Sequence, residues 1–444
     1  MPNAGPESPS ASAHGVGKAG GEYRWVICAL LFFATTINYI DRQVLSLLKG
    51  TLDAQFHWTN REFGIINGFF QGAYGFGLLW FGWFVDRYGV KVGYAVSIAG
   101  WSLAAAGHAL VQSVVGFKIA RICLGLSESG NFPSAIKAAA QWFPKKERAF
   151  ATALFNSGAN VGPILAPATI PFIAAKYGWR AAFVIAGLAG FVWLIAWWLI
   201  YEVPERHKRV KAAELAWIRS DAADAVNTEK IPWLHLLAYR QTWSFVAGKF
   251  LTDSIWWFFL TWLPDYFKAS RDLDIKVSWI YLCAIYAECT VLSIAGGWLT
   301  GHLNQRGWSV TRSRKTGMFL YAVCVTPIFF VTRCGVWPAV GLIGLAAGAH
   351  QAWSANLYTT VSDMFPKRAI ASVIGIGGMA GSAGAMFFPV FTGMMLDHFA
   401  KTNRVTDGYA ILFGICSCAY LVAFVANHLL APRFEPFNLK LKSA

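Results

Sequence analysis

The feature that most constrains this chain is a succession of long apolar runs separated by short charged segments. Each run is about 20 residues long, the length that a helix needs to cross the hydrocarbon core of a bilayer. Only 14% of the 444 residues are charged and 56% are hydrophobic, whereas soluble proteins carry about 25% charged residues. The sequence therefore predicts an all-α polytopic membrane protein, and a water-soluble enzyme does not fit it.

This length accommodates about twelve membrane-spanning helices. The apolar runs place them at residues 24–48, 60–84, 91–112, 115–141, 148–174, 180–202, 242–267, 275–300, 314–333, 337–362, 369–395 and 406–431.

The longest polar gap divides the chain into two halves. We expect six-helix bundles over residues 23–202 and 242–432, joined by a cytoplasmic loop over 203–241. The end of that loop, 231–237, is predicted to form a short interfacial helix. Residues 1–22 and 433–444 are expected to be cytoplasmic tails, the first of them disordered because it is rich in Pro, Ser, Gly and Ala.

The distribution of positive charge predicts the orientation. The chain has a net charge of +15, and one set of alternate loops carries more than twice as many Lys and Arg residues as the other set. The positive-inside rule then places both termini in the cytoplasm, and we expect a multi-pass protein of a bacterial inner membrane. No basic domain of folding size is present, so nucleic-acid binding is not expected.

The two halves repeat each other. The loop after the second run reads Gly82-Trp-Phe-Val-Asp86-Arg87-Tyr-Gly89-Val-Lys91, and the corresponding loop of the second half begins at Gly297. Phe143-Pro144-Lys145-Lys146 precedes the fifth run, as Phe365-Pro366-Lys367-Arg368 precedes the eleventh. Duplicated halves on one side of a membrane indicate a transporter with its site between them.

The motif Gly82-x-x-x-Asp86-Arg87-x-Gly89-x-Lys91 resembles the signature loop of the major facilitator superfamily. Asn38-Tyr39-Ile40-Asp41-Arg42, with the stretch from Arg121 through Glu128 to Pro133, resembles the anion:cation symporter family within it. The stretches 249–264 and 350–358 are similar to those of bacterial hexuronate transporters.

This resemblance extends over residues 23 to 432. It implies a twelve-helix major facilitator fold and proton-coupled uptake of glucuronate or galacturonate. One departure is Gly301-His302, where the second-half loop of such proteins often keeps Asp-Arg, so a cytoplasmic latch there is weakened or asymmetric.

Several polar residues inside the runs are candidates for substrate binding, because ionisable groups cost about 2.5–3.5 kcal/mol each at the centre of a membrane helix and mark functional cavities. Arg42 can hold a carboxylate through two parallel hydrogen bonds, Lys249 supplies a cation from the second half, and Trp257 can stack on a sugar ring. The full candidate set is Tyr39, Arg42, Tyr74, Asn160, Lys249, Asp253, Trp257, His350, Gln351 and Asn356. Each of these residues could instead pack in the protein interior or form a hydrogen bond between two helices. A single buried histidine such as His350 is more often a hydrogen-bonded core residue than a ligand-binding residue.

Proton coupling requires a carboxyl group whose protonation changes with its surroundings. The resemblance assigns this role to Asp41 and Glu128, with Arg121 holding or tuning one of them. Arg121 and Glu128 are seven residues apart and share a helix face, so a purely structural ion pair between them is the alternative. Gly82, Asp86, Arg87, Gly89 and Lys91 are expected to form a conformational latch that pairs with neighbouring helix ends and favours the outward-open state.

Three alternatives remain open at this point. The substrate could be another organic anion, such as an aldonate or aldarate. A polytopic membrane enzyme is disfavoured because the chain has no metal pair, nucleophile–base motif or phosphate loop, and no cofactor is expected. A channel is disfavoured by the duplicated halves. The expected partners are a small organic anion, protons and the lipid bilayer, and the expected state is a monomer.

Overall fold

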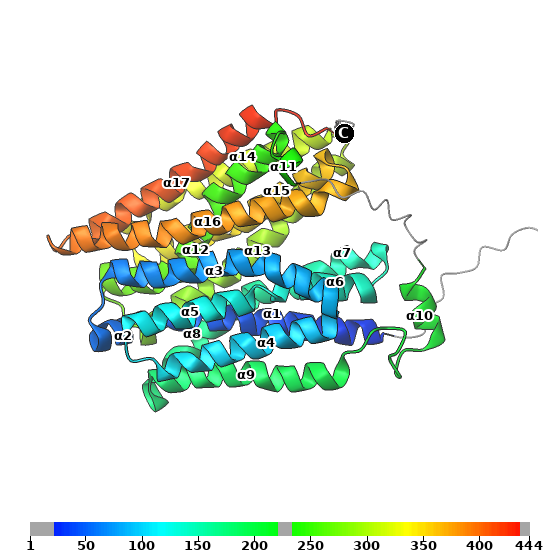
Figure 1. Ribbon diagram of the computed structural model, residues 1–444. Coiled ribbons are helices and arrows are strands. Elements are labelled where there is room, and N and C mark those ends of the chain that lie inside the picture. Colours follow the sequence, from blue (N-terminus) through cyan, green and yellow to red (C-terminus); the bar gives the residue numbers. More distant parts are fainter. Residues whose placement is uncertain (1–21, 221–232, 436–444) are drawn as a thin grey trace, which may run out of the picture.

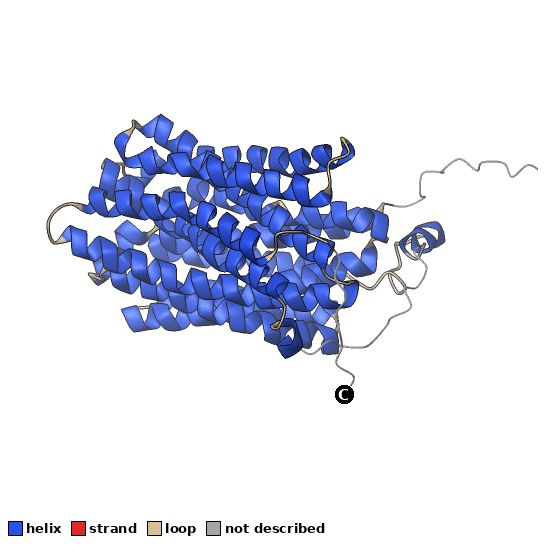
Figure 2. Ribbon diagram, turned by 90° about the horizontal axis from the view of Figure 1, so that it is seen from above, coloured by secondary structure: helices blue, strands red, loops and turns tan. Residues whose placement is uncertain are grey.

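The computed structural model describes residues 22–220 and 233–435, in which every regular element is a helix and no strand occurs (Figure 2). The all-α class predicted from the apolar runs is confirmed. The expected disordered tail, the middle of the central loop and most of the C-terminal tail lie outside the described residues.

Each expected span coincides with a helix or with a pair of consecutive helical segments (Figure 1). The first half contains α1 (Tyr23–Leu47), α3 (Asn60–Tyr88), α4 (Val90–Gly107), α5 (Val114–Glu128), α6 (Asn131–Trp142), α7 (Lys145–Asn156), α8 (Gly158–Tyr177) and α9 (Trp179–Ile200). The second half contains α12 (Arg240–Arg271), α13 (Ile275–Gln305), α14 (Val310–Val325), η2 (Thr326–Arg333), α15 (Val336–Met364), α16 (Lys367–Ala400) and α17 (Val405–Leu430).

Within the described residues, 7 helical segments are long and apolar enough to cross a membrane by length and composition alone. The helices α3, α12 and α15 are not among them. These three carry buried polar side chains such as Gln71, Lys249 and Asn356, which lower their mean hydropathy. In these three helices, low mean hydropathy thus accompanies polar groups in the protein interior.

The span expected at 115–141 is one run in the sequence but two helices in the structure. Helix α5 ends at Glu128 and α6 begins at Asn131. Gly130 lies between them, and Pro133 is accommodated in the first turn of α6, where its missing N–H costs nothing. This break places the Glu128 carboxyl in the protein interior, with the residue 0% exposed.

Short helices complete the connections. Helix α2 (Lys49–Phe56) follows α1, and α10 (Ala212–Ile218) and α11 (Trp233–Leu236) belong to the central segment. The described part of the interfacial helix predicted at 231–237 is α11. Helix α10 lies against the first half, where Glu214 accepts a hydrogen bond from the Arg24 backbone N–H at 3.0 Å and is nearly fully buried.

The closest packing between the halves is that of α3 against α16, and it depends on glycine. A Cβ added at Gly64 would lie 2.3 Å from the Pro389 carbonyl oxygen, and one at Gly68 would lie 2.8 Å from the Met386 carbonyl oxygen. Glycines four residues apart on one helix face allow such backbone approach. The pattern of apolar runs does not predict this stripe.

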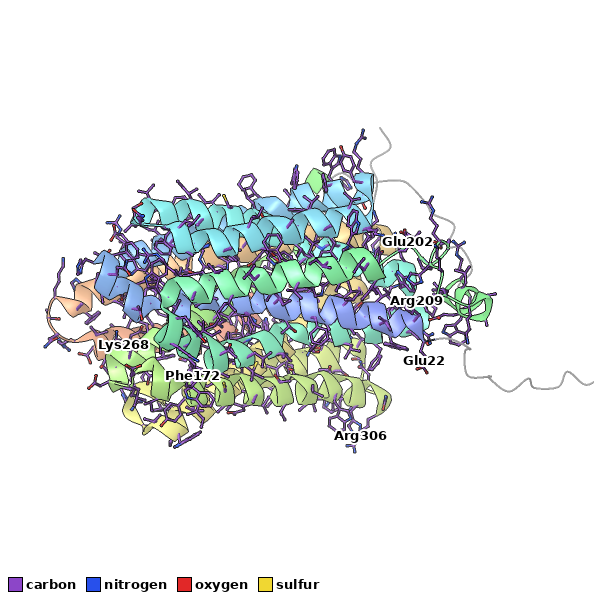
Figure 3. All side chains as sticks on the ribbon, turned by 90° about the horizontal axis from the view of Figure 1, so that it is seen from below. Glu22, Phe172, Glu202, Arg209, Lys268 and Arg306 are labelled. Carbon is purple, nitrogen blue, oxygen red and sulfur yellow. The ribbon has the colours of Figure 1, made fainter. Side chains whose placement is uncertain are left out.

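The two halves meet at one end of the molecule and diverge towards the other (Figure 1). We call the end that carries Glu22, Glu202 and Arg306 the terminal end, and the end that carries Lys268 the far end (Figure 3). A Cβ at Gly82 of α3 or Gly375 of α16, both towards the terminal end, would meet nothing within 4 Å. The backbones of α3 and α16 thus approach each other closely at Gly64 and Gly68 but not at Gly82 or Gly375.

The positive-inside pattern predicts that the terminal end is cytoplasmic, which single cysteines can test. In a background lacking the eight native cysteines, Arg404→Cys should react with an impermeant thiol reagent in intact cells, because Arg404 lies exposed at the start of α17. Ser220→Cys should react only after the membrane is permeabilised. Labelling of Ser220→Cys but not Arg404→Cys in intact cells would reverse the orientation.

Candidate functional site

The centre of the candidate site is a buried ion pair between α1 and the end of α5. The Arg42 Nε atom lies 2.6 Å from Glu128 Oε2, and the two side chains are 4% and 0% exposed. Arg42 is therefore the ionic partner of Glu128, and the alternative of a structural Arg121–Glu128 pair is not what the structure contains. A buried pair of this kind is held in place because either charge alone would be strongly destabilising.

Aromatic rings from both halves surround the Arg42 guanidinium. Its Cζ atom lies 4.7 Å from the ring centroid of Tyr39, 4.8 Å from Tyr74, 5.6 Å from Phe70 and 5.2 Å from Trp257. Such cation–π contacts each contribute about 0.5–2 kcal/mol. Because Trp257 belongs to α12, this aromatic cage joins the two halves at the ion pair.

Asp41 and Arg121 flank the pair, but they do not form an ion pair with each other. Asp41 is 2% exposed, and within the described chain neither of its carboxyl oxygens has a hydrogen-bond partner. The Arg121 Nη2 donates to the Arg42 carbonyl oxygen at 3.4 Å, while Arg121 Nε also lacks a partner among the described residues. The structure thus holds two buried ionisable groups with unused hydrogen-bonding capacity beside the Arg42–Glu128 pair.

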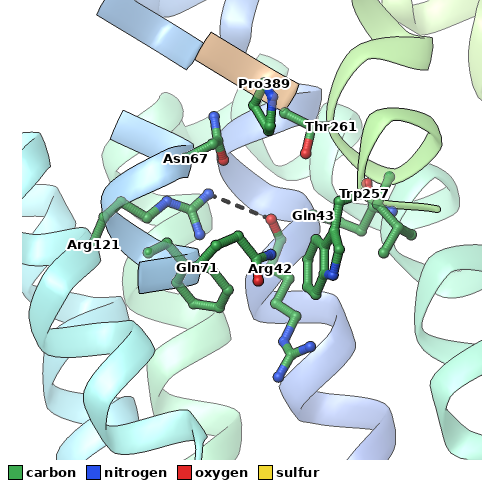
Figure 4. Close-up of a pocket in the computed structure, with 10 residues that line it drawn as sticks. Arg42, Gln43, Asn67, Gln71, Arg121, Trp257, Thr261 and Pro389 are labelled. Carbon is green, nitrogen blue, oxygen red and sulfur yellow. Dashed lines mark hydrogen bonds between the residues drawn. The ribbon is translucent and has the colours of Figure 1, made fainter. Parts of the chain in front are cut away.

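A small cavity adjoins these groups (Figure 4). In that view, the Arg42 guanidinium points away from the carbonyl oxygen that Arg121 contacts. The lining is rich in amides and cations, and it consists of Arg42, Gln43, Asn67, Phe70, Gln71, Arg121, Trp257, Leu260, Thr261 and Pro389. Such groups can hold water or hydroxyl groups next to a charged site.

The second cation, Lys249, is neutralised within its own helix. Its Nζ lies 2.7 Å from Asp253 Oδ2, one turn along α12, and 4.7 Å from the ring centroid of Tyr358. Lys249 thus already has an ionic partner on its own helix.

His350 has the contacts of a histidine satisfied within its own half. Its Nδ1 lies 2.6 Å from the Tyr420 hydroxyl, and its ring stacks on Trp256 at a centroid distance of 5.1 Å and an angle of 6°. The residue is only 3% exposed. These contacts favour a packing role for His350 over ligand binding.

The remaining polar candidates fall into two groups. Gln351 Nε2 donates to Asn160 Oδ1 at 3.3 Å, which links α15 with α8 across the halves. Asn356 instead accepts from Arg314 Nη1 at 3.1 Å, and Arg314 also pairs with Asp363 at 3.1 Å. The Gln351–Asn160 pair is thus an inter-half contact, whereas Asn356 belongs to a charged network inside the second half.

The expected latch residues pair with neighbouring helices of the first half. Asp86 lies 2.7 Å from Lys137 Nζ of α6, and Lys91 lies 3.0 Å from Glu202, which follows α9. The hydrogen bond from Lys91 lowers the pKa of the Glu202 carboxyl below its usual value. Gly89 has φ +84°, a conformation that favours glycine at this turn, and Arg87 extends over Tyr88.

The sequence did not single out some residues that the structure places at the candidate site. Phe70 and Tyr358 contribute rings beside the two cations, and Gln43, Asn67 and Gln71 line the cavity. The amides carry a readable signal, because polar side chains are rare inside membrane helices. Phe70 carries no such signal in the sequence, since aromatic residues are common throughout these spans.

A two-half helical bundle with buried charges between its halves is the architecture of a membrane transporter. The family model of the Major Facilitator Superfamily matches residues 31–389, and the chain belongs to this superfamily.

Several relatives of this chain are named as transporters of sugar acids. The chain is 28% identical over 400 residues to the hexuronate transporter of Escherichia coli (strain K12), with 88% of this chain and 90% of the relative covered. It is 31% identical over 256 residues to the galacturonate transporter of Dickeya chrysanthemi, covering 57% and 74%. It is 26% identical over 416 residues to the D-galactonate transporter of Escherichia coli O6:H1, covering 91% and 97%. The family and these relatives are transporters and not enzymes, as predicted.

Solved structures share the fold at low sequence identity. The D-xylose-proton symporter superposes with a TM-score of 0.73 at 15% identity, covering 93% of this chain and 99% of that chain. A bacterial homologue of the human lysosomal transporter Spinster, in an inward-facing and occupied conformation, gives 0.71 at 18% identity, covering 93% and 97%. The predicted major facilitator fold is thereby confirmed.

The geometry predicts which arginine is coupled energetically to Glu128. Arg42→Met should destabilise the protein by about 3–5 kcal/mol, because it leaves a buried carboxylate without its partner. Adding Glu128→Gln should recover most of that loss. Unfolding of the purified single and double variants in detergent measures the coupling. The matched cycle with Arg121→Met should show a clearly smaller coupling to Glu128, and a larger one would contradict the assigned pair.

Proposed function

We propose that the protein is a proton-coupled symporter that carries hexuronates, such as glucuronate and galacturonate, into the cell by alternating access. The observation that carries this proposal is the buried Arg42–Glu128 ion pair, set in an aromatic cage formed by both halves. Such a site offers a cation for a carboxylate and a titratable acid that competes for the same cation.

Arg42 is proposed to bind the carboxylate of the substrate. Its planar guanidinium can take a carboxylate through two parallel hydrogen bonds, and its Nη2 has no partner among the described residues. The rings of Tyr39, Tyr74 and Trp257 would face the apolar side of the sugar. On the side of the second half, the Lys249–Asp253 pair offers charged hydrogen-bonding groups for hydroxyls.

Competition for Arg42 provides the coupling. While Glu128 is ionised, it occupies the guanidinium at 2.6 Å, and a second carboxylate would bring an uncompensated negative charge into a buried site. Protonation of Glu128 removes this conflict and leaves Arg42 available for the substrate. Asp41 is a second proton carrier, since an ionised carboxyl without hydrogen-bond partners is costly where Asp41 lies.

The relatives support a sugar-acid substrate and also define the alternative. Relatives of similar identity are named hexuronate, D-galactonate and probable galactarate/D-glucarate transporters. All three substrate classes present a carboxylate and several hydroxyls, which the same cation can recognise. An aldonate or aldarate is therefore the second candidate substrate.

The orientation belongs to the same proposal. In this proposal the protein is a monomer in a bacterial inner membrane, with both termini in the cytoplasm. The residues Gly82, Asp86, Arg87, Gly89 and Lys91 then lie at the cytoplasmic end. There the pairs Asp86–Lys137 and Lys91–Glu202 are positioned to act as the latch.

Uptake into proteoliposomes tests this function. Radiolabelled glucuronate should accumulate above its bath concentration when the outside is acidic, and a protonophore should abolish the accumulation. Unlabelled galacturonate, galactonate and galactarate added in competition identify the preferred substrate class. Uptake that only equilibrates, whatever the pH gradient, would contradict proton coupling.

The variant Glu128→Gln separates binding from coupling. It keeps the size and hydrogen bonding of the side chain but cannot ionise, so Arg42 should remain available to the substrate. We expect the variant to bind glucuronate and to exchange it across the membrane, but not to accumulate it under a pH gradient. Asp41→Asn should behave similarly, with weaker binding because it adjoins Arg42. A stable Glu128→Gln protein that still accumulates substrate would exclude Glu128 as the essential proton site.

A further inference from the structure

At the far end, one carboxylate of the second half binds the start of a helix of the first half. The two oxygens of Asp397, near the end of α16, accept hydrogen bonds from the backbone N–H groups of Asn60 and Arg61, both at 2.9 Å. These residues are the first two of α3. The contact is therefore a helix cap supplied from across the interface between the halves.

The chain's own capping residue does not serve these two N–H groups. The Thr59 side chain accepts from the Glu62 N–H, and Glu62 accepts in return from the Thr59 N–H. This capping box satisfies the third residue of the helix and leaves the first two N–H groups for another acceptor. Asp397 fills that place, where the helix dipole also favours a negative charge.

The backbone is shaped for this contact. A Cβ at Gly393, one turn before Asp397, would lie 2.2 Å from the Asn60 carbonyl oxygen, so only glycine allows α16 to approach the start of α3. An ion pair also joins the halves nearby. Lys49 of α2 lies 2.7 Å from Asp265 of α12. The far end is thus closed by polar contacts that link the two halves directly.

We propose that Asp397 is a detachable cap of α3, which holds the far end closed in this conformation and is released when the far end opens. Opening separates α16 from α3, and water then replaces the carboxylate at the two N–H groups. Both partners are only part-buried or exposed, so the exchange costs little and the contact biases the conformation without locking it. This inference rests on the alternating access proposed above, but not on the identity of the substrate.

Distances between spin labels across the far end test the proposal. Lys176→Cys at the end of α8 and Lys401→Cys after α16 place labels at exposed positions on the two halves, in a background lacking the native cysteines. Pulsed electron resonance on the purified protein in lipid nanodiscs measures their separation without requiring any transport. Asp397→Ala should raise the ratio of long to short distances by about two- to fivefold, the size expected for a charge at a helix N-terminus.

The control variant is Asp407→Ala. Asp407 is an exposed carboxylate at the same end of the molecule, but it pairs with Arg404 of its own half and makes no contact across the halves through that pair. It should leave the distance distribution unchanged. An unchanged distribution in Asp397→Ala, or an equal shift in Asp407→Ala, would overturn the proposal. Circular dichroism and thermal unfolding of each variant establish that the protein is folded. If labelled glucuronate is not transported but Asp397→Ala still shifts the distances, only the proposed substrate fails.

Discussion

The Arg42–Glu128 ion pair is the interaction on which the rest of this structure depends. Two buried charges inside a membrane protein are tolerated only together, so α1 and α5 are held in one relative position. The aromatic cage around Arg42 then draws Trp257 of the second half to the same point. A change in the charge of either partner therefore alters a contact at the interface between the halves, as the proposed alternating access requires.

The fold places this pair at a break between α5 and α6. Glu128 is the last residue of α5, and the break at Ser129–Gly130 aims its carboxyl at α1. Glycines on α3 let α16 pack closely at the far end, and the Asp397 and Lys49 contacts close that end with polar bonds. The Asp397 contact is part-buried or exposed, so the halves can part there more readily than at the apolar packing within each half.

Much of the fold was predictable from the sequence, because the apolar runs report bilayer-spanning length directly. The positions of the ionisable residues inside those runs also indicated candidate site residues. Their pairing was not predictable: Arg121 shares a helix face with Glu128, yet Arg42 of another helix is its partner. Helix spacing reports only neighbours on the same element, whereas the pairing is set by how α1 packs against α5. Likewise, no local pattern reveals that Asp397 caps a helix more than 300 residues earlier.

The central claim is that the substrate carboxylate competes with Glu128 for Arg42. The most direct test is to measure how many protons the protein takes up or releases when the substrate binds. If the substrate carboxylate takes the place of Glu128 at Arg42, Glu128 must be protonated in the complex. Glucuronate added to the purified protein in weakly buffered solution should then cause net proton uptake, read with a pH indicator, at a pH where Glu128 is ionised in the free protein. Glu128→Gln should bind glucuronate without that uptake. Tight binding to the native protein with no proton uptake at any pH would contradict the account.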